Sequence, residues 1–186
     1  MPFDPQRHRR RSIRLKGYDY SQTGAYFVTV CAHNRECLFG EIVAAEMRLN
    51  ETGEAVAECW DHLTDHFPHV ELDAFVAMPN HVHGIIVIAD GDGRGKAFAG
   101  VRKCFTPTVK RGSLAGSLCA AVQNFKSVST RKINQRRDTR GAPVWQRNYY
   151  EHIIRNEKEL DRIRAYIAGN PARWNEDVEN PRRAIR

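Results

Sequence analysis

Several features are scarce or absent in this chain of 186 residues, and each absence argues against a class of protein. No stretch approaches the roughly 20 consecutive apolar residues of a transmembrane helix. The five cysteines include no Cys-x-x-Cys pair and are odd in number, which is typical of a protein in a reducing compartment. No apolar segment follows the arginines near residue 10, so we expect no secretory signal and a cytoplasmic protein.

Acidic residues are missing from one long segment, because residues 93–137 contain no Asp or Glu although Lys and Arg recur there. A second basic zone lies at residues 7–16, with the sequence RHRRRSIRLK. The formal net charge is +7. Two separate basic zones favour a polyanionic partner, above all nucleic acid, while the alternative for the first ten residues is a solvated tail. Neither zone has a sustained apolar face, which disfavours a membrane partner.

Hydrophobic patterns divide the remaining chain into strands and helices. Apolar runs predict strands over residues 25–32, 40–43, 70–78 and 81–88, the last two joined as a hairpin across Pro79 and Asn80. Apolar residues at steps of three or four predict helices over 49–67, from 113 to about 132, and over 156–169. Asn50 and Asn156 are the expected N-caps, with Glu159 completing a capping box. Residues 142–154 are expected to be extended.

The order of these elements is strand, helix, hairpin, helix, strand, helix. With short antiparallel strands and the helices covering one face of the sheet, it predicts an α+β fold related to the ferredoxin-like and RRM-like arrangements. We expect a basic arm over residues 1–20, one domain over 21–174 and a tail over 175–186. The glycine-rich stretch near 90–110 predicts a mobile loop that can close over a ligand.

The segment MPNHVHGIIVI, residues 78–88, places two histidines where the pattern calls for apolar side chains. On a strand, His81 and His83 point to the same face, together with Ile85 and Val87. Two imidazoles so close together can share one metal ion. The alternative is a pair of ordinary histidines bonded to backbone groups, and the pattern alone leaves both interpretations open.

Two further polar residues lie on one face of the last predicted helix. Tyr166 and Asn170 are four residues apart, which is the spacing of neighbours on a helix surface. Pro171 disfavours a helical conformation at Asn170 and is expected to end the helix there, which frees the amide to turn toward an ion. The alternative is that Tyr166 is a core aromatic residue and Asn170 a simple C-cap.

Taken together, these motifs resemble the single-tyrosine HUH transposases, and most closely the branch called REP-associated tyrosine transposases (RAYTs). The resemblance covers residues 10–174 and rests on RRSIRLKGYDYSQTGAYFVTVCAHN, MPNHVHGIIVI, WQRNYYEHIIRNEKEL and YIAGNPARW. It implies the HUH endonuclease fold, with His81 and His83 as the metal pair and Asn170 as the third ligand. Tyr166 matches the nucleophile that attacks a DNA phosphate and leaves a 5′-phosphotyrosine and a free 3′-hydroxyl. Tyr149 and Tyr150 remain as rival nucleophiles.

The resemblance also implies a divalent cation, Mg²⁺ or Mn²⁺, and single-stranded DNA whose palindromic repeats form hairpins. Two imidazoles and an amide suit Mn²⁺ better than Mg²⁺, which prefers oxygen ligands. We expect a monomer or homodimer associated with the nucleoid. Trp145, Tyr149 and Tyr150 are candidates for stacking on unpaired bases, although Trp145 also fits a hydrophobic core. The expected phosphate contacts are Arg9, Arg10, Arg11, Arg14, Lys16, Lys126, Arg131, Lys132 and Arg147.

Three other functions are alternatives to this interpretation. A histidine-triad nucleotide hydrolase needs a third alternating histidine, and position 85 is Ile. The HUH enzymes of plasmid transfer and rolling-circle replication are typically larger and order their motifs differently. A catalytically silent binder of structured single-stranded nucleic acid, with histidines that serve only the core, is the remaining alternative.

Overall fold

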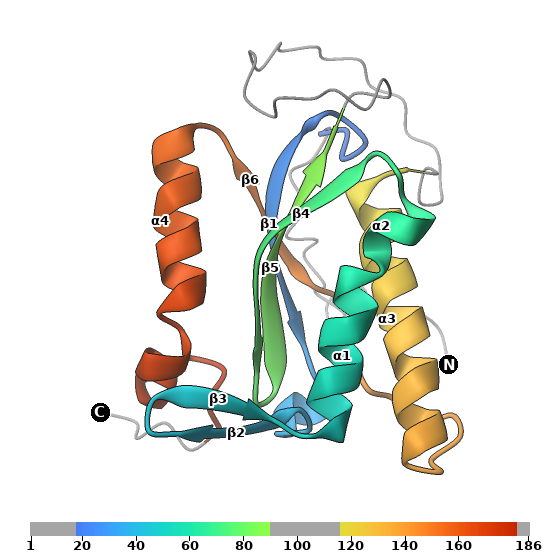
Figure 1. The fold of residues 1–186 in the computed structure, drawn as a ribbon. Coiled ribbons are helices and arrows are strands. Elements are labelled where there is room, and N and C mark those ends of the chain that lie inside the picture. Colours follow the sequence, from blue (N-terminus) through green and yellow to red (C-terminus); the bar gives the residue numbers. More distant parts are fainter. Residues whose placement is uncertain (1–17, 90–115, 182–186) are drawn as a thin grey trace, which may run out of the picture.

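A four-stranded antiparallel sheet forms the centre of the structure, which is a computed structural model describing residues 18–89 and 116–181 (Figure 1). Its strand order is β4-β5-β1-β6. The strands are β1 (Gly24–Cys31), β4 (Val70–Met78), β5 (His81–Ile88) and β6 (Tyr150–Ile154). The expected loop near 90–110 and the expected arm residues Arg9, Arg10, Arg11, Arg14 and Lys16 lie outside the described residues.

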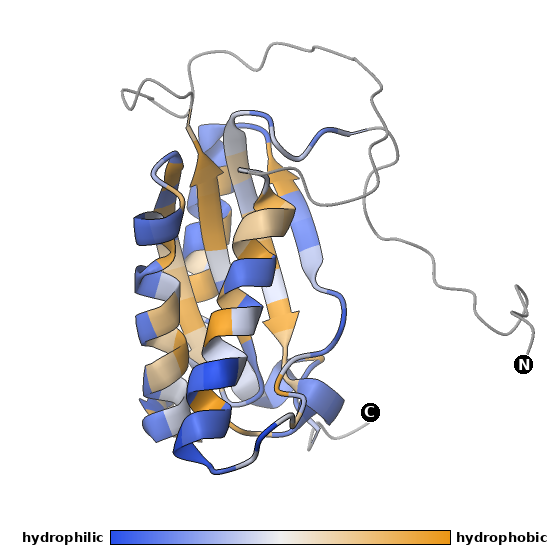
Figure 2. Ribbon diagram, turned by 90° about the vertical axis from the view of Figure 1, so that its right-hand side faces the viewer, coloured by the Kyte–Doolittle hydropathy of each residue, from blue (hydrophilic) through white to orange (hydrophobic). Residues whose placement is uncertain are grey.

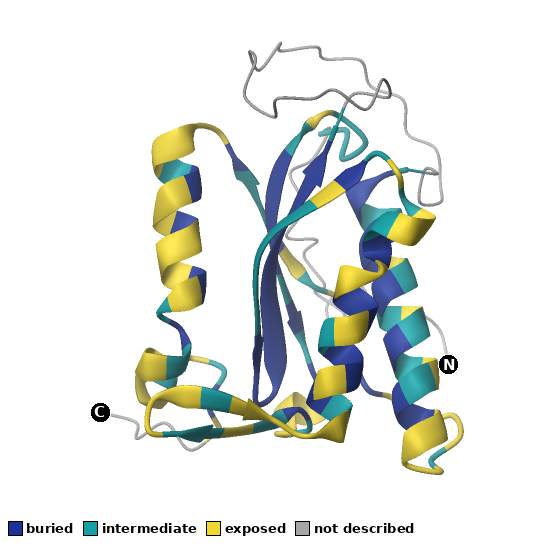
Figure 3. Ribbon diagram, viewed as in Figure 1, coloured by how far each residue is buried: buried dark blue, intermediate teal, exposed yellow. Residues whose placement is uncertain are grey.

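Helices pack against both faces of this sheet (Figure 1). One face is covered by α1 (Glu51–Asp61), continued after a break by α2 (Leu63–His66), and by α3 (Leu118–Arg136), while α4 (Glu157–Ala168) covers the other. Figure 2 shows apolar strands behind helices that carry many hydrophilic residues, and Figure 3 shows α4 buried only on the side that faces the sheet. No described helix is long and apolar enough to cross a membrane.

The predicted α+β class is therefore confirmed, but the expectation that the helices share one face holds only for α1 and α3. The reason lies in β5, which is buried at all eight positions and so offers an apolar row to each side. One row, with Ile86, belongs to the core under α1 and α3. The other, with Ile85, packs with Ile163 and Ile167 of α4.

The predicted caps are present at the helix starts. The side chain of Asn50 accepts hydrogen bonds from the backbone of Thr52 and Gly53, and that of Asn156 accepts one from Glu159 at 2.9 Å. The carboxylate of Glu159 accepts the backbone N–H of Arg155 rather than that of the cap residue. This variant of the capping box satisfies one orphan donor of α4, the N–H of Glu159, and one donor of the residue before the cap.

A small second sheet pairs β2 (Gly40–Val43) with β3 (Glu46–Leu49). Only β2 was predicted. The turn between them places Ala44 and Ala45 at φ of 52° and 65°. Such turns normally use Asn or Gly at these positions, so two alanines give no recognisable hairpin signal.

A β-bulge in β4 changes which of its side chains face α4. Leu72 pairs with Ile86 and Phe75 with Gly84, so three steps along β4 match two along β5. The extra residue turns Leu72 to the face opposite Val76. Simple alternation along the strand would place Leu72 on the same face as Ala74, Val76 and Met78, and the bulge makes that pattern fail at Leu72.

Gly84, in the middle of β5, is a position where a single added methyl group should be damaging. A Cβ there would lie 2.3 Å from Cζ2 of Trp60. That ring is held between Phe75 and Phe125 and has little room to move. We expect Gly84→Ala to lower the free energy of unfolding by about 2–3 kcal/mol in urea denaturation, as for overpacked cores.

The matched control for this substitution is Gly24→Ala, at the start of β1. A Cβ at Gly24 would make only ordinary contacts, the nearest at 3.6 Å to Tyr26. Its free energy of unfolding should be unchanged or slightly raised. Equal losses in the two variants would show that the contact with Trp60 is not what makes Gly84 necessary.

Candidate active site

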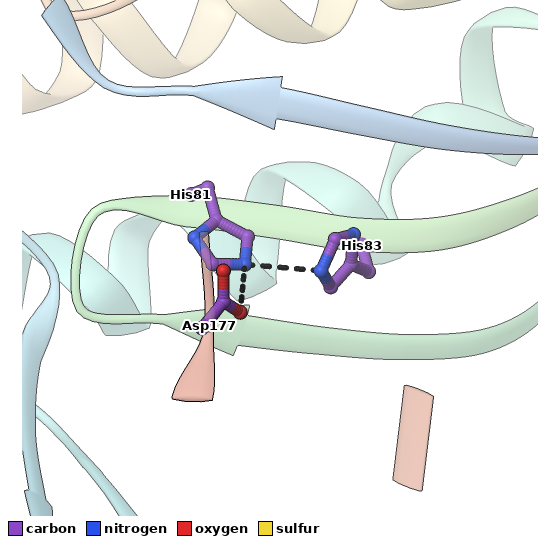
Figure 4. A group of neighbouring side chains, drawn as sticks. All are labelled: His81, His83 and Asp177. Carbon is purple, nitrogen blue, oxygen red and sulfur yellow. Dashed lines mark hydrogen bonds and ion pairs between the residues drawn. The ribbon is translucent and has the colours of Figure 1, made fainter. Parts of the chain in front are cut away.

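The two histidines of β5 lie side by side on one face of the strand and meet a carboxylate from the C-terminal segment (Figure 4). His81 and His83 are 0% and 4% exposed, and their Nε2 atoms lie 3.0 Å apart. Asp177 follows the 3-10 helix η2 (Pro171–Glu176) and places Oδ2 3.7 Å from Nε2 of His81. One ligand atom from each of the three residues lies within 4.8 Å of the others.

The outer ring nitrogens of both histidines have their own partners. The amide nitrogen of Asn80 donates to the carbonyls of Glu179 (2.7 Å) and Arg35 (3.1 Å), which fixes the amide orientation. Its oxygen therefore accepts the Nδ1 proton of His81 at 2.9 Å. Nδ1 of His83 lies 2.8 Å from the hydroxyl of Thr29. These bonds can leave both Nε2 lone pairs directed at the shared point, as in metal-binding histidines.

The electrostatics of the cluster favour a cation. Burial lowers the pKa of both His81 and His83, and the neighbouring His81 lowers that of His83 further. Both rings are therefore neutral at neutral pH. Two lone pairs and the Asp177 carboxylate then converge on one point, an arrangement that a shared proton or a cation stabilises. Two nitrogens and one oxygen form a donor set that suits a divalent transition metal.

The hydroxyl of Tyr166 lies at the edge of this cluster, 3.5 Å from Nε2 of His83. Its ring is 42% exposed and meets Phe27 edge-on, with the ring centroids 6.0 Å apart. Two residues earlier on α4, the guanidinium of Arg164 binds both oxygens of Asp73 on β4, at 2.8 and 2.6 Å. This bidentate pair anchors the part of α4 that carries Tyr166.

Asn170, the expected third ligand, lies in the connection between α4 and η2. It is buried, and its backbone is helical (φ −64°, ψ −44°), so the expected non-helical conformation is wrong. Pro171 is accommodated because it takes the first position of η2, where no N–H is needed. No hydrogen bond to another described residue uses the Asn170 side chain, so its role as a ligand stays a prediction. Asp177 is a ligand candidate that the sequence did not single out.

The remaining nucleophile candidates differ in their surroundings. Tyr149 and Tyr150 both line a cavity of about 430 Å³ that His83 and Tyr166 also line. Tyr149 in addition packs against the core beneath α1 and α3, whereas Tyr150 is 48% exposed. Cys31 lines the same cavity. Burial and the nearby Glu179 raise the pKa of its thiol to about 12, so Cys31 stays protonated and unreactive at neutral pH.

The structure brings three of the predicted phosphate contacts together. Lys126, Arg131 and Arg147 line a cavity of about 380 Å³ between α3 and the segment that leads to β6. The ammonium of Lys126 donates to the backbone carbonyls of Gln146 and Arg147, which ties the two walls together. Lys132 lies apart from them and pairs with Glu58 of α1.

Trp145 occupies the hydrophobic core, as one of its two interpretations predicted. It is 7% exposed and packs against Phe39 and Phe125. Its indole N–H donates to the hydroxyl of Ser129 at 2.9 Å. Trp145 is therefore engaged in packing and is not available for stacking on a base.

The partner of His83 offers a test of the metal site. Thr29→Val removes the hydroxyl at nearly constant shape, so the ring loses the contact that orients it. We expect Mn²⁺ to bind about tenfold more weakly in isothermal titration calorimetry, the usual cost of losing such a partner. Thr29→Ser keeps the hydroxyl and should bind Mn²⁺ like the wild type. Equal affinity for Mn²⁺ in the two variants would remove Thr29 from the site.

Three comparisons relate the chain to known proteins. No family model matches it. A Haemophilus influenzae protein without an assigned function is 44% identical over 170 residues, which cover 91% of this chain and 92% of the relative. A second protein of that organism, which carries the name of a REP-associated tyrosine transposase, is 23% identical over 157 residues, covering 83% and 74% of the two chains.

One solved structure has the same fold. It is a REP-associated tyrosine transposase bound to a REP hairpin, with a TM-score of 0.57 and 20% sequence identity. The likeness covers 87% of this chain and 74% of that one. The matched part therefore includes most of the sheet and helices that position the histidines and Tyr166.

Proposed function

The chain belongs to one family with the Haemophilus influenzae protein to which it is 44% identical, and from its likeness to REP-associated tyrosine transposases in sequence and fold we propose a function of that kind. It is a metal-dependent endonuclease and strand transferase that acts on single-stranded, hairpin-forming DNA. The observation that carries the proposal is the Tyr166 hydroxyl at 3.5 Å from the histidine pair.

Tyr166 is the proposed nucleophile. Its phenolic oxygen attacks the phosphorus of a DNA phosphodiester, the bond from phosphorus to the 3′-oxygen breaks, and a 5′-phosphotyrosine and a 3′-hydroxyl result. The phenolic proton can pass to solvent because the side chain is 42% exposed. Since the covalent link keeps the energy of the broken bond, the 3′-hydroxyl of another strand can reverse the step without ATP.

His81, His83 and Asp177 are the proposed ligands of a divalent cation, with Asn170 retained as a candidate from the family pattern. When bound, the cation withdraws charge from the phosphate and orients it for in-line attack. Two nitrogen donors and one oxygen favour Mn²⁺ over Mg²⁺. Asn80 and Thr29 hold the two rings in the orientation that this requires.

Hairpin DNA is the proposed partner, by analogy with the solved relative. Lys126, Arg131 and Arg147, gathered around one cavity, are the described residues best placed to contact its phosphates. Within one chain, Tyr166 already reaches His83, which favours a catalytic unit that does not need a partner subunit. A site of action at the nucleoid follows from a DNA substrate.

The test is to incubate the protein and Mn²⁺ with labelled hairpin oligonucleotides taken from the genome that encodes it. A denaturing gel should show a covalent protein–DNA adduct that disappears when a chelator is added. Mass spectrometry of the adduct identifies the modified tyrosine. Tight binding to a hairpin without adduct or cleavage under any divalent ion would leave the silent binding protein as the correct function.

A further inference from the structure

The cavity beside Tyr166 is larger than the space that one reacting phosphate group would occupy. Its volume is about 430 Å³, within the range of pockets that hold small organic molecules. His83, Tyr166 and Asp177 form one side of it. A group that fills the rest of this cavity would therefore lie directly next to a phosphate held at the hydroxyl of Tyr166.

Tyr150 forms another part of the cavity wall, and its position is set by the sheet. Thr29 of β1 pairs with His83 on one side and with Tyr150 on the other, so the three side chains lie in one row across the same face. The Tyr150 ring meets Phe27 only edge-on, with centroids 6.3 Å apart. At 48% exposed, it leaves much of its surface to solvent beside the site.

The walls of the cavity suit a nucleobase better than a phosphate. Phe27, Tyr150 and the 67%-exposed Val178 supply flat or apolar surface. The carboxylates of Asp177 and Glu179 also line it, and only Glu179 has a neighbouring guanidinium, that of Arg35 at 2.9 Å. A second phosphate would be repelled there, whereas a base carries no charge.

The rim adds groups that can distinguish one base from another. Gln146 and Asn148 both line the cavity, and no hydrogen bond to another described residue uses either side-chain amide. An amide offers a donor and an acceptor together, which matches the paired donor and acceptor on the edge of a base.

We propose that this cavity binds the unpaired base of a nucleotide next to the cleaved phosphate, with Tyr150 as the stacking platform and Gln146 and Asn148 at its edge. The inference rests on the function proposed above and adds a specificity subsite to it. Base stacking on an aromatic side chain tolerates any sequence, while the two amides confer preference.

The test combines Tyr150→Ala with an abasic site moved through the unpaired nucleotides of the same genomic hairpin oligonucleotides. Affinity is measured by fluorescence polarisation, and adduct formation on denaturing gels with Mn²⁺. Tyr150→Ala should bind intact DNA about tenfold more weakly than the wild type. For the wild type, an abasic site next to the cleaved phosphate should lower the affinity for DNA by a similar factor. The same abasic site should lower the affinity of Tyr150→Ala little further, because both changes remove the same contact.

Tyr150→Phe keeps the ring, so the abasic position that weakens binding to the wild type should weaken binding to this variant by a similar factor. If Tyr150→Ala fails to fold, Tyr150→Thr removes the ring while keeping a residue suited to strands. If the abasic site and the Tyr150→Ala substitution each lowered the affinity for DNA by its full factor when combined, the subsite would be ruled out, even with normal adduct formation. If no oligonucleotide gives an adduct, the proposed chemistry fails, and the binding measurements alone still decide whether the base and Tyr150 are coupled.

Discussion

Tyr166→Phe is expected to abolish the covalent adduct while leaving the affinity for hairpin DNA unchanged. The substitution removes the one oxygen of this side chain, which is its only atom able to bond to phosphorus, and keeps the ring that contacts Phe27 and His83. Adduct formation should fall by at least about a thousandfold, as expected for the loss of a nucleophile. The measurement is a time course on denaturing gels with Mn²⁺ and a single cognate oligonucleotide.

Two matched substitutions test whether the loss of adduct is specific to the hydroxyl of Tyr166. Tyr149→Phe and Tyr150→Phe remove the hydroxyls of the rival candidates, and both should form adduct at the rate of the wild type. Thermal unfolding of the three variants should coincide, because none of the three changes removes a ring. Loss of the adduct in Tyr150→Phe with its retention in Tyr166→Phe would reassign the nucleophile to β6.

Removing the carboxylate of Asp177 is expected to weaken metal binding strongly. Asp177→Ala leaves the two imidazoles without their anionic partner, so Mn²⁺ affinity should fall by about a hundredfold or more, and adduct formation should fall with it. Asn170→Ala tests the ligand expected from the family pattern. A loss of Mn²⁺ affinity confined to Asn170→Ala would restore that assignment and leave Asp177 without a role at the metal.

His81→Ala serves as the reference for complete loss of the metal site. Calorimetric titration with Mn²⁺ and with Mg²⁺ should rank the wild type above Asp177→Ala, and Asp177→Ala above His81→Ala. Mn²⁺ should bind the wild type more tightly than Mg²⁺, because Mg²⁺ gains less from nitrogen ligands. The reverse preference would indicate that oxygen ligands dominate the site.

The hairpin that carries the histidines could be predicted from the sequence because local rules suffice for it. Apolar runs on either side of Pro79 and Asn80 predict two strands, and the two-residue period of a strand puts His81 and His83 on one face. The helix that bears Tyr166 was equally accessible, since its cap at Asn156 and its apolar spacing are both local signals.

The parts that could not be predicted depend on contacts between distant segments. Placing α4 on the second face requires knowing that β5 is buried on both sides. The bulge between Leu72 and Phe75 leaves the apolar composition of β4 unchanged and alters only its register. Asp177 approaches His81 because of the path that the C-terminal segment takes, and no periodic pattern in the sequence predicts that path.

At the tight turn of Pro79 and Asn80, the number of residues between β4 and β5 matters as much as which side chains the strands carry. A residue inserted or deleted there would shift β5 by one position against β4 and reverse its two faces. His81 and His83 would then enter the core under α1, and a bulky side chain would replace Gly84 against Trp60. Relatives of this protein that keep the chemistry are therefore expected to tolerate substitutions in this hairpin more readily than insertions or deletions.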